Sequence, residues 1–396
     1  MDTPFGLPVP PAARVVVGLS GGVDSAVTAL RLKRAGYDVL GLFMKNWEDD
    51  DAFGDCPAAD DIADVQAIAA HIDIPVQVIN FAAEYREQVF AHFLAEYRRG
   101  RTPNPDVLCN RQIKFGVFRE HALAQGAQVI ATGHYAALRR TGGAVELLCP
   151  ADHDKDQTYF LHALTQAQLA PAGFPLADIT KQQVRALALE AGLPVARKKD
   201  STGICFIGER PFREFLGRYL ETEPGDMLDA DGRVVGRHVG LPYYTLGQRQ
   251  GLGIGGGHGT GNDPWYVADK DAARNVLIVV QGHDHPLLLS TALVSEPATW
   301  IAGTAPAATF ACTAKTRYRQ RAEPCEVTVA DDGRCTVRFA RPQRAVTPGQ
   351  SVVFYRDAVC LGGAVIDAAM PLVRHESQAL RGATADARHP MSGATA

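Results

Sequence analysis

The sequence predicts an α/β protein: a doubly wound parallel sheet, followed by a small connecting domain and a C-terminal β-barrel. Up to about residue 200, apolar strand-like runs alternate with segments whose apolar residues recur at helical spacing. One of these strands passes through a glycine-rich turn directly into a helix. From about residue 283 the helical spacing is lost and short strands follow one another, which is typical of a small barrel.

The chain has 396 residues, more than one typical core holds, so we expect several domains. We predict a flexible N-terminus, an α/β domain, a connecting domain, a barrel and a disordered polar tail. Their boundaries are, in order, 1–13, 14–210, 211–282, 283–370 and 371–396.

Composition excludes several classes of protein. No run of about 18 apolar residues occurs, so we expect no membrane span. The Pro-rich start lacks the pattern of a signal peptide, which predicts a cytoplasmic protein with reduced thiols. None of the eight cysteines forms a CxxC pair, which argues against a zinc ribbon or an iron–sulfur cluster. The net charge of −4 gives no overall nucleic-acid signal, so any RNA contact must come from local basic patches.

The first strand, Val15 to Leu19, is apolar enough to be covered on both faces. Gly21 and Gly22 permit a tight turn and have no Cβ to block a ligand. The helix that follows ends near Gly36, and its first N–H groups attract anions. A phosphate or pyrophosphate cradle is favoured over an ordinary tight turn, and it is not a Walker loop because no Lys follows the last glycine. The predicted ATP-binding residues here are Gly18, Leu19, Ser20, Gly21, Gly22, Val23, Asp24 and Ser25.

This unit resembles the pyrophosphate-binding (PP) loop of the N-type ATP pyrophosphatases, which split ATP into AMP and pyrophosphate to activate an oxygen. The resemblance implies an adenine nucleotide alpha hydrolase-like domain. Further strands are expected at 37–44, 75–80 and 126–134, and helices at 58–71 and 84–99. Ligands lie at the carboxyl ends of such strands, so Met44, Gly133 and His134 are candidates for lining adenine and ribose. For Met44, a core methionine is an equal alternative.

The stretch from Arg98 to Asn110 contains a glycine and two prolines, which predict a rigid loop after the helix. Cys109 lies among cations, and a helix start is expected at Asn110, so we expect the pKa of the Cys109 thiol to be lowered. Asp106, three residues earlier, could accept or relay a proton. The alternative is a buried structural cysteine behind a proline turn.

A second thiol, Cys205, follows three basic residues in a Ser-Thr-Gly loop and mirrors Cys109. Two such loop thiols without a CxxC motif indicate persulfide or transient disulfide chemistry. Between them, Lys155, Asp156 and Gln157 offer a donor, an acceptor and an amide for nucleic-acid contacts. As the start of a surface helix, the same three residues would be unremarkable.

In the predicted barrel, cations alternate along one face of an expected strand, with Tyr318 on the other. They are Lys315, Arg317, Arg319 and Arg321. Such a stripe suits phosphate tracking, although a solvated barrel face is the alternative. Four further cysteines, at 312, 325, 335 and 360, are most simply core residues.

Together these motifs resemble the bacterial tRNA-specific 2-thiouridylase family. The resemblance rests on the segments 18–25, 104–110, 131–135, 154–157, 201–210, 243–249 and 317–320, and extends to about Ile366. It implies that ATP and Mg²⁺ are used and that Cys109, Cys205 and Asp106 are catalytic. It also implies that Asn104, Pro105 and Asp106 hold the target base, and that tRNA contacts His134, Lys155, Asp156, Gln157, Arg317, Tyr318 and Gln350.

The reaction implied by this family is ATP-dependent 2-thiolation of the wobble uridine (U34) in the tRNA anticodon stem-loop. The C2 oxygen is adenylated, pyrophosphate leaves, and sulfur from a Cys205 persulfide, supplied by a persulfide donor protein, replaces the oxygen as AMP departs. Cys109 releases that sulfur or pairs with Cys205 in a disulfide. The residues themselves show only two comparable thiols and do not say which performs which step.

Two other classes of function remain open at this stage. Loops of this kind also serve ligase-type adenylating enzymes such as GMP synthetase or argininosuccinate synthase, which need neither paired loop thiols nor a basic barrel. A non-catalytic RNA-binding or sulfur-carrier protein is the third possibility, but it would leave the phosphate loop without a purpose.

Overall fold

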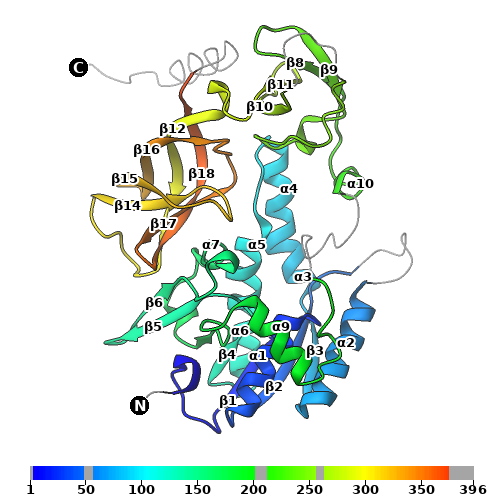
Figure 1. Cartoon of the computed structure of the whole chain (residues 1–396), viewed down its shortest axis with the longest axis vertical. Coiled ribbons are helices and arrows are strands. Elements are labelled where there is room, and N and C mark those ends of the chain that lie inside the picture. Colours follow the sequence, from blue (N-terminus) through cyan, green and yellow to red (C-terminus); the bar gives the residue numbers. More distant parts are fainter. Residues whose placement is uncertain (1–2, 49–56, 201–211, 256–262, 374–396) are drawn as a thin grey trace, which may run out of the picture.

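The computed structural model describes residues 3–48, 57–200, 212–255 and 263–373. Figure 1 shows an α/β part below, with the barrel and the connecting domain side by side above it. Helix α4 (Ala91–Arg98) rises between these parts toward the connecting domain. Within the described residues no helix is long and apolar enough to cross a membrane.

The α/β part is built on one parallel sheet in the order β3-β2-β1-β4-β7. The strands are β1 (Arg14–Leu19), β2 (Asp38–Lys45), β3 (Val76–Asn80), β4 (Val129–Ala131) and β7 (Ala172–Gly173). The chain moves outward from β1 to β3 and then returns to the other side of β1 with β4. The junction of β1 and β4 is therefore the switch point at which such sheets bind ligands.

Helices cover both faces of this sheet, which confirms the doubly wound prediction. Val15, Val17 and Leu19 face α1 (Val23–Arg34), α2 (Pro57–Ile72) and α9 (Lys181–Glu190), whereas Val16 faces the opposite layer. That opposite layer holds two long helical runs. The first consists of α3 (Ala82–Tyr85), η2 (Arg86–Phe90) and α4, and the second of α5 (Pro105–Leu108), η3 (Cys109–Val117) and α6 (Phe118–Ala124).

A hairpin of the α/β part joins the barrel, which the sequence did not reveal. Strands β5 (Ala137–Thr141) and β6 (Ala144–Leu148) pair with each other, and β6 also pairs with β18 (Val359–Pro371) of the barrel. Short helices follow the hairpin: η4 (His153–Lys155), α7 (Thr158–Leu161) and α8 (Gln166–Leu169). One buried cluster accordingly contains residues of both parts, including Leu147 and Tyr355.

The connecting domain begins with α10 (Phe212–Leu216) and contains a sheet in the order β10-β11-β8-β9. Its strands are β8 (Gly225–Leu228), β9 (Val234–His238), β10 (Trp265–Asp271) and β11 (Val276–Gln281), with η5 (Leu241–Tyr243) after β9. Met227, Val267 and Leu277 lie in its small core.

The predicted C-terminal barrel is confirmed. Its strands run in the order β12-β16-β15-β14-β17-β18, and pairing of β12 with β18 closes the ring. The remaining bounds are β12 (Leu289–Pro297), β14 (Thr309–Lys315), β15 (Glu323–Val329), β16 (Arg334–Arg344) and β17 (Ser351–Arg356), with η6 (Pro286–Leu288) before β12 and β13 (Thr299–Trp300) beside β18.

The N-terminal segment corrects one prediction. Residues 3–13 were expected to be flexible, yet η1 (Pro4–Gly6) forms there and Leu7 is buried in the cluster beneath α1. The Arg140 guanidinium also donates a hydrogen bond of 2.8 Å to the Gly6 carbonyl. The segment is held because one large apolar side chain finds a place in the core, which the proline content alone did not indicate. Of the predicted tail, residues 374–396 lie outside the described part.

Candidate nucleotide and thiol site

The phosphate loop has the geometry that its glycines predicted. Gly21 adopts a φ of +72°, and Gly22 is the N-cap of α1. The Ser25 hydroxyl ties the turn together, because Oγ accepts from the Ser20 N–H and donates to the Gly22 carbonyl, each at 3.1 Å. The N–H groups of the first helical turn have no partner within the helix. The loop therefore offers an anion a ready row of donors.

Residues from other strands form the walls beside this loop. A Cβ on Gly133 would lie 2.9 Å from the Ser25 nitrogen, so a side chain there would crowd the helix start. A Cβ on Gly18 would meet Met44, Thr132 and Phe118 at 3.7–3.9 Å. Gly18, Met44 and Gly133 thus come together at the switch point of the sheet, as their positions after strands predicted.

Asp24 in the loop is part of an ion network that the sequence did not reveal. Its carboxylate accepts from the Tyr135 hydroxyl at 2.9 Å and from Lys181 Nζ at 2.7 and 2.8 Å. Lys181 also contacts Asp200 at 2.8 Å, and Lys155 reaches Asp200 at 3.0 Å. Burial raises the pKa of Asp200, but hydrogen bonds from the two lysines outweigh it and lower that pKa to about 2. Burial, and then the charge of Asp24, raise the pKa of Tyr135.

His134 is a core residue in this structure. Its side chain is 8% exposed, its Nδ1 shares a hydrogen bond of 2.7 Å with Thr132 Oγ1, and its ring lies near Phe115 and Phe174. Burial, and then the charge of Lys114, lower its pKa well below the ordinary value. The structure thus places the His134 ring in the core, and the RNA contact expected at this position stays a prediction.

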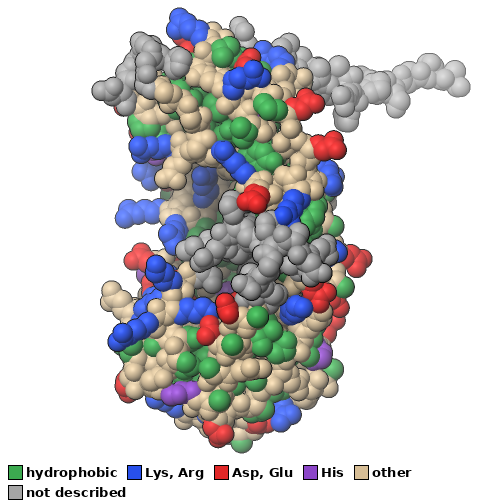
Figure 2. Space-filling model, turned by 90° about the vertical axis from the view of Figure 1, so that its right-hand side faces the viewer, with side chains coloured by type: hydrophobic (Ala, Val, Ile, Leu, Met, Phe, Trp, Pro, Cys, Tyr) green, Lys and Arg blue, Asp and Glu red, His purple; other side chains and the backbone are tan. Residues whose placement is uncertain are grey.

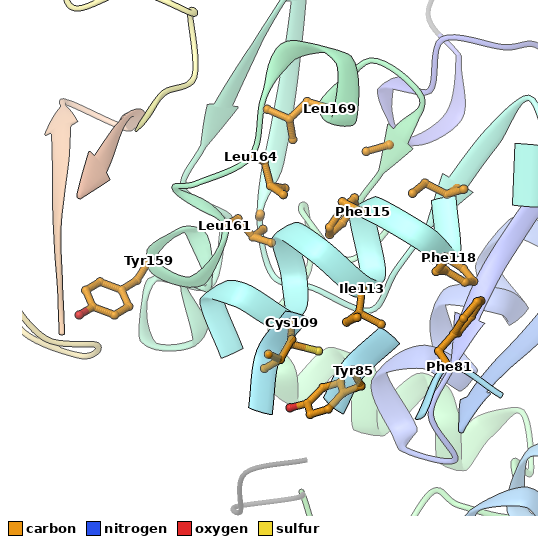
Figure 3. Packing of buried hydrophobic residues seen from close by; sticks show 14 of the residues in the cluster. Phe81, Tyr85, Cys109, Ile113, Phe115, Phe118, Tyr159, Leu161, Leu164 and Leu169 are labelled. Atoms are coloured by element: carbon orange, nitrogen blue, oxygen red, sulfur yellow. The ribbon is translucent and has the colours of Figure 1, made fainter. Parts of the chain in front are cut away.

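Cys109 lies in a helix and not in the predicted loop. Pro105 occupies the first helical position, and the Asn104 side chain caps this start by accepting from the Asp106 N–H at 3.2 Å. Figure 3 shows Cys109 packed among Tyr85 and Ile113, and it is 1% exposed. The Asn-Pro pair begins a helix where we expected a loop to continue.

Asp106 lies one turn before Cys109 on the same helix. Burial raises the pKa of this carboxyl, and the positive charge of Lys114 opposes the shift only in part. A carboxyl that retains its proton more readily is suited to donate or relay one. After a kink at Gly116 the next helix begins at Phe118, whose ring faces Gly18 of the phosphate loop. Two consecutive helices thus lead from the acid and the thiol to the loop.

The three polar residues 155–157 are engaged within the protein. Asp156 is 6% exposed and accepts from Thr158, and Lys315 Nζ of the barrel reaches it at 2.8 Å. Gln157 Oε1 accepts from the Tyr135 N–H at 2.9 Å. Asp156 thus lies buried between the α/β part and the barrel and Lys155 remains half-exposed, while the RNA contacts expected of these residues stay predictions.

The predicted cationic stripe is wrong as a strand face. β14 ends at Lys315, and the chain turns through residues 316–319, with Arg319 at a φ of +65°. Lys315 points to Asp156, whereas Arg317 is mostly buried and donates to the Ala345 carbonyl and the Thr347 hydroxyl at 3.1 Å. Only Arg319 and Arg321 of the four are exposed. Alternation ends because the strand ends.

Two further predicted RNA contacts lie at the same junction. The Tyr318 ring is half-buried and lies 4.5 Å, centroid to centroid, from that of Phe160. Gln350 donates from Nε2 to the Thr102 carbonyl at 2.8 Å. Figure 2 shows Lys and Arg side chains around a hollow between the lower and upper parts of the molecule. Basic character is therefore concentrated where these parts meet.

Comparison with known proteins identifies the family. Family models match residues 13–209 (tRNA methyl transferase HUP domain), 213–281 (tRNA methyl transferase PRC-barrel domain) and 290–366 (aminomethyltransferase beta-barrel domain). A tRNA-specific 2-thiouridylase MnmA of Methylobacillus flagellatus is 56% identical over 90% of this chain and 99% of its own length. One from Cupriavidus metallidurans is 59% identical over 89% of this chain and 99% of its own length. The chain belongs to the tRNA-specific 2-thiouridylase MnmA family.

This confirms the resemblance drawn from the motifs. The family models carry the words methyl transferase in their descriptions, but the relatives that match almost from end to end are named as thiouridylases. The thiouridylase name therefore describes the family better than the model descriptions do.

Of the two thiols expected in this family, only Cys109 can be placed. Cys205 lies outside the described residues, although Asp200, a few residues before it, is fixed to the loop network by Lys181. Lys181, Tyr135 and Asp200 are the functional candidates that sequence reasoning missed. No local pattern could have found them, since they are far apart in sequence and are joined only in the folded protein, Tyr135 and Lys181 at Asp24 and Asp200 through Lys181.

A bound divalent cation would need ligands beyond the protein. Among the described residues no group of three or more His, Cys, Asp or Glu side chains could hold a metal ion. Asp24 is the one carboxylate of the loop, and Mg²⁺ commonly binds through one or two carboxylates and the substrate phosphates. The residues present thus fit a Mg²⁺ that arrives with a nucleotide.

Proposed function

We propose that this chain replaces the C2 oxygen of the wobble uridine of tRNA with sulfur, using ATP to activate that oxygen. The names of full-length relatives at 56–59% identity support the substrate and the reaction. The observation that supports the proposal in the structure is the pair of consecutive helices that carries Asp106 and Cys109 and then places the Phe118 ring against Gly18. The acid, the thiol and the phosphate loop would then serve one site.

ATP is the proposed ligand of the loop from Gly18 to Ser25. The N–H groups at the start of α1 would receive its β- and γ-phosphates, which leave as pyrophosphate. Met44 and Gly133 would line the adenine and ribose. Lys181 and Tyr135 hold the Asp24 carboxylate in place, so that the loop keeps its shape while the charge on the phosphates changes. Bound Mg²⁺ would supply positive charge to the phosphates.

The target base is proposed to leave its stack and lie against the start of the Cys109 helix. Residues Asn104 to Asp106 would hold it there. The C2 oxygen then attacks the α-phosphorus, a bond to AMP forms, and pyrophosphate departs. Because burial raises the pKa of Asp106, its carboxyl is suited to exchange a proton with the base during this step.

Sulfur is proposed to reach C2 from a persulfide on Cys205, loaded by a persulfide donor protein. The terminal sulfur forms the new bond to C2, and AMP leaves with the former C2 oxygen. Cys109 then attacks the Cys205 sulfur of this linkage, so that the S–S bond breaks, the 2-thio base is released and a Cys109–Cys205 disulfide remains for an external thiol to reduce. In the alternative order, Cys109 attacks the persulfide first, the same disulfide forms, and the sulfide that is released adds to C2. Both routes need a second thiol close to the activated base.

The test is mass spectrometry of the wobble nucleoside after incubation with ATP, unmodified tRNA and a persulfide source. The expected result is a product heavier by the difference between sulfur and oxygen. Cys109→Ser and Cys205→Ser are each expected to abolish it, whereas Cys312→Ser in the barrel should leave it unchanged. Full thiolation by either of the first two variants would falsify the paired-thiol scheme.

Pyrophosphate exchange and AMP release separate the other classes of function. A ligase for small metabolites would exchange pyrophosphate into ATP with its metabolite and without tRNA. A non-catalytic RNA-binding protein would release no AMP when tRNA is added. The proposal requires AMP release that depends on tRNA containing a wobble uridine.

A further inference from the structure

The barrel contacts the entry to the Cys109 helix through one tight turn, Thr347–Gln350. The Thr102 N–H donates to the Pro348 carbonyl at 3.0 Å, and Gln350 Nε2 donates to the Thr102 carbonyl at 2.8 Å. Both main-chain groups of Thr102 are therefore bound by the barrel. Thr102 lies two residues before Asn104, the cap of the helix that carries Asp106 and Cys109.

Gly349 allows the turn to approach this closely. Its φ is +92°, and a Cβ at this position would lie 2.9 Å from the nitrogen, carbonyl carbon and oxygen of Thr102. The Gly349 N–H donates to the Ile366 carbonyl of β18 at 2.9 Å, which fixes the turn to the barrel. Glycine is required both by the backbone conformation and by the contact with Thr102.

Charged side chains stabilise both partners of this contact, the segment before Thr102 and the turn of the barrel. Arg101 pairs with Glu296 of β12 at 2.6 Å, with Asp367 of β18, and with the buried Glu96 at 3.3 Å. On the barrel side, Arg317 donates to Thr347 in the turn itself. Arg317 and Gln350, both predicted as RNA contacts, thus stabilise the turn and its bond to the catalytic domain.

We propose that the Thr347–Gln350 turn positions the Asn104–Cys109 helix start, so that the barrel is a working part of the thiol site as well as an RNA platform. This inference rests on the proposed function for its catalytic consequence. The Pro103 ring restricts Thr102 to extended conformations, so a shift of Thr102 is passed on to the Asn104 cap. RNA that contacts Gln350 would compete for the amide that holds Thr102, and docking on the barrel would thereby reach the catalytic helix.

The test compares Gly349→Ala with Gly303→Ala in the full chain. Gly303 has a similar φ of +86°, but a Cβ there meets nothing within 4 Å, so this variant has the backbone strain without the contact. The first readout is the rate at which iodoacetamide alkylates Cys109 in the reduced protein, followed by peptide mass spectrometry. Cys360, which is fully buried in the core, reports unfolding of the barrel.

Gly349→Ala is expected to raise the alkylation rate of Cys109 about tenfold by loosening the helix start, while Cys360 stays protected. It should also lower kcat for thiolation about tenfold with the KM for ATP unchanged, because the phosphate loop is untouched. Gly303→Ala should match the wild type in both readouts. Equal Cys109 alkylation and equal kcat in the two glycine variants would overturn the proposal.

If Cys360 becomes reactive in Gly349→Ala, the barrel has unfolded and a second variant is needed to test the proposal. Gln350→Met removes one hydrogen bond without a steric clash, and it must then raise Cys109 alkylation above the wild-type rate. An unchanged rate would overturn the inference. A wild-type protein that does not thiolate tRNA, but whose Cys109 responds to Gly349→Ala, would refute the proposed function and still support the positioning role of the turn.

Discussion

The phosphate loop and the basic segment of the barrel were both predicted from short sequence patterns. The loop has the predicted conformation, whereas the basic segment does not. In the loop, the strand, the turn and the helix occur where the residues predicted them. In the barrel, residues 315–321 leave the strand after Lys315, and two of the four cations turn inward. The loop offers main-chain N–H groups to a ligand, whereas the barrel cations act through side chains whose direction depends on distant partners.

The two regions differ in how far apart in the sequence the residues lie that determine their conformation. The backbone turn from Gly18 to Ser25 follows from these eight residues, because glycine conformation and helix capping are local effects. Only the Asp24 side chain depends on distant partners, Lys181 and Tyr135. The direction of the Lys315 side chain is set by Asp156, which is far away in the sequence. The two residues meet only because the barrel packs against the α/β part. A pattern of polar residues therefore does not distinguish contacts between domains from contacts with RNA.

The largest expected effect is at the phosphate loop. Asp24→Asn should lower tRNA-dependent AMP release about a thousandfold, because it weakens the bonds to Lys181 and Tyr135 that hold the loop. Quantification of AMP by chromatography measures this loss. Asp38→Asn, which removes an exposed pair with Arg14, is the matched control and should retain normal activity. If Asp24→Asn loses only a small part of its AMP release, the loop is not the main determinant of ATP activation.

The next effect is on stability at the barrel junction. Lys315→Met should lower the free energy of unfolding by about 3 kcal/mol, because it leaves the buried Asp156 carboxylate without its cation. Arg321→Met, at an exposed position of the same segment, should change stability by less than about 0.5 kcal/mol. Urea unfolding of both variants tests this contrast. Similar losses in the free energy of unfolding would indicate that the cations of residues 315–321 have equivalent surroundings, as a uniform stripe would.

Asp106 should show a smaller effect that depends on pH. Its pKa is raised in the folded protein, so burial of the ionised carboxylate destabilises the fold once pH rises through the folded pKa. Asp106→Asn should therefore be more stable than the wild type at neutral pH, and the difference should vanish as pH falls below both pKa values. Melting temperatures across this range measure the effect, and a gap that widens on acidification would contradict the sign of the shift.

The smallest effect belongs to the exposed cations. Arg319→Ala and Arg321→Ala should each weaken tRNA binding and lower the salt dependence of affinity by about one unit of slope, with little change in stability. Filter binding at several salt concentrations tests this. An unchanged slope in both variants would place the RNA elsewhere on the protein.

Much of the fold could be predicted because it depends on short-range periodicity. Four of the five strands of the parallel sheet follow from apolar runs, and the barrel from recurring short strands and turns. The fifth strand, β7, has only two residues and was not predicted. Cys109 was recognised as a candidate but was assigned to a loop, because the two prolines were taken to interrupt the helix. At the first helical position, after the Asn104 cap, Pro105 instead begins one. The hairpin β5–β6, which extends the barrel from the other domain, left no local signal.

The site network could not be predicted for the same physical reason. Lys181 begins a well-capped surface-like helix, and nothing near it in sequence indicates Asp24 or Asp200. His134 follows a strand end as nucleotide-binding residues do, but its ring turns into the core between Phe115 and Phe174. Side-chain direction at such positions is set by tertiary packing.

The central claim is that ATP activates the C2 oxygen of the wobble uridine, and one isotope measurement tests it directly. The tRNA is prepared with a heavy oxygen isotope at C2 of that uridine and incubated with the protein, ATP and a persulfide source. The account predicts that the heavy oxygen appears in the phosphate group of AMP, in proportion to the 2-thiouridine formed. Thiolated tRNA with unlabelled AMP would contradict it.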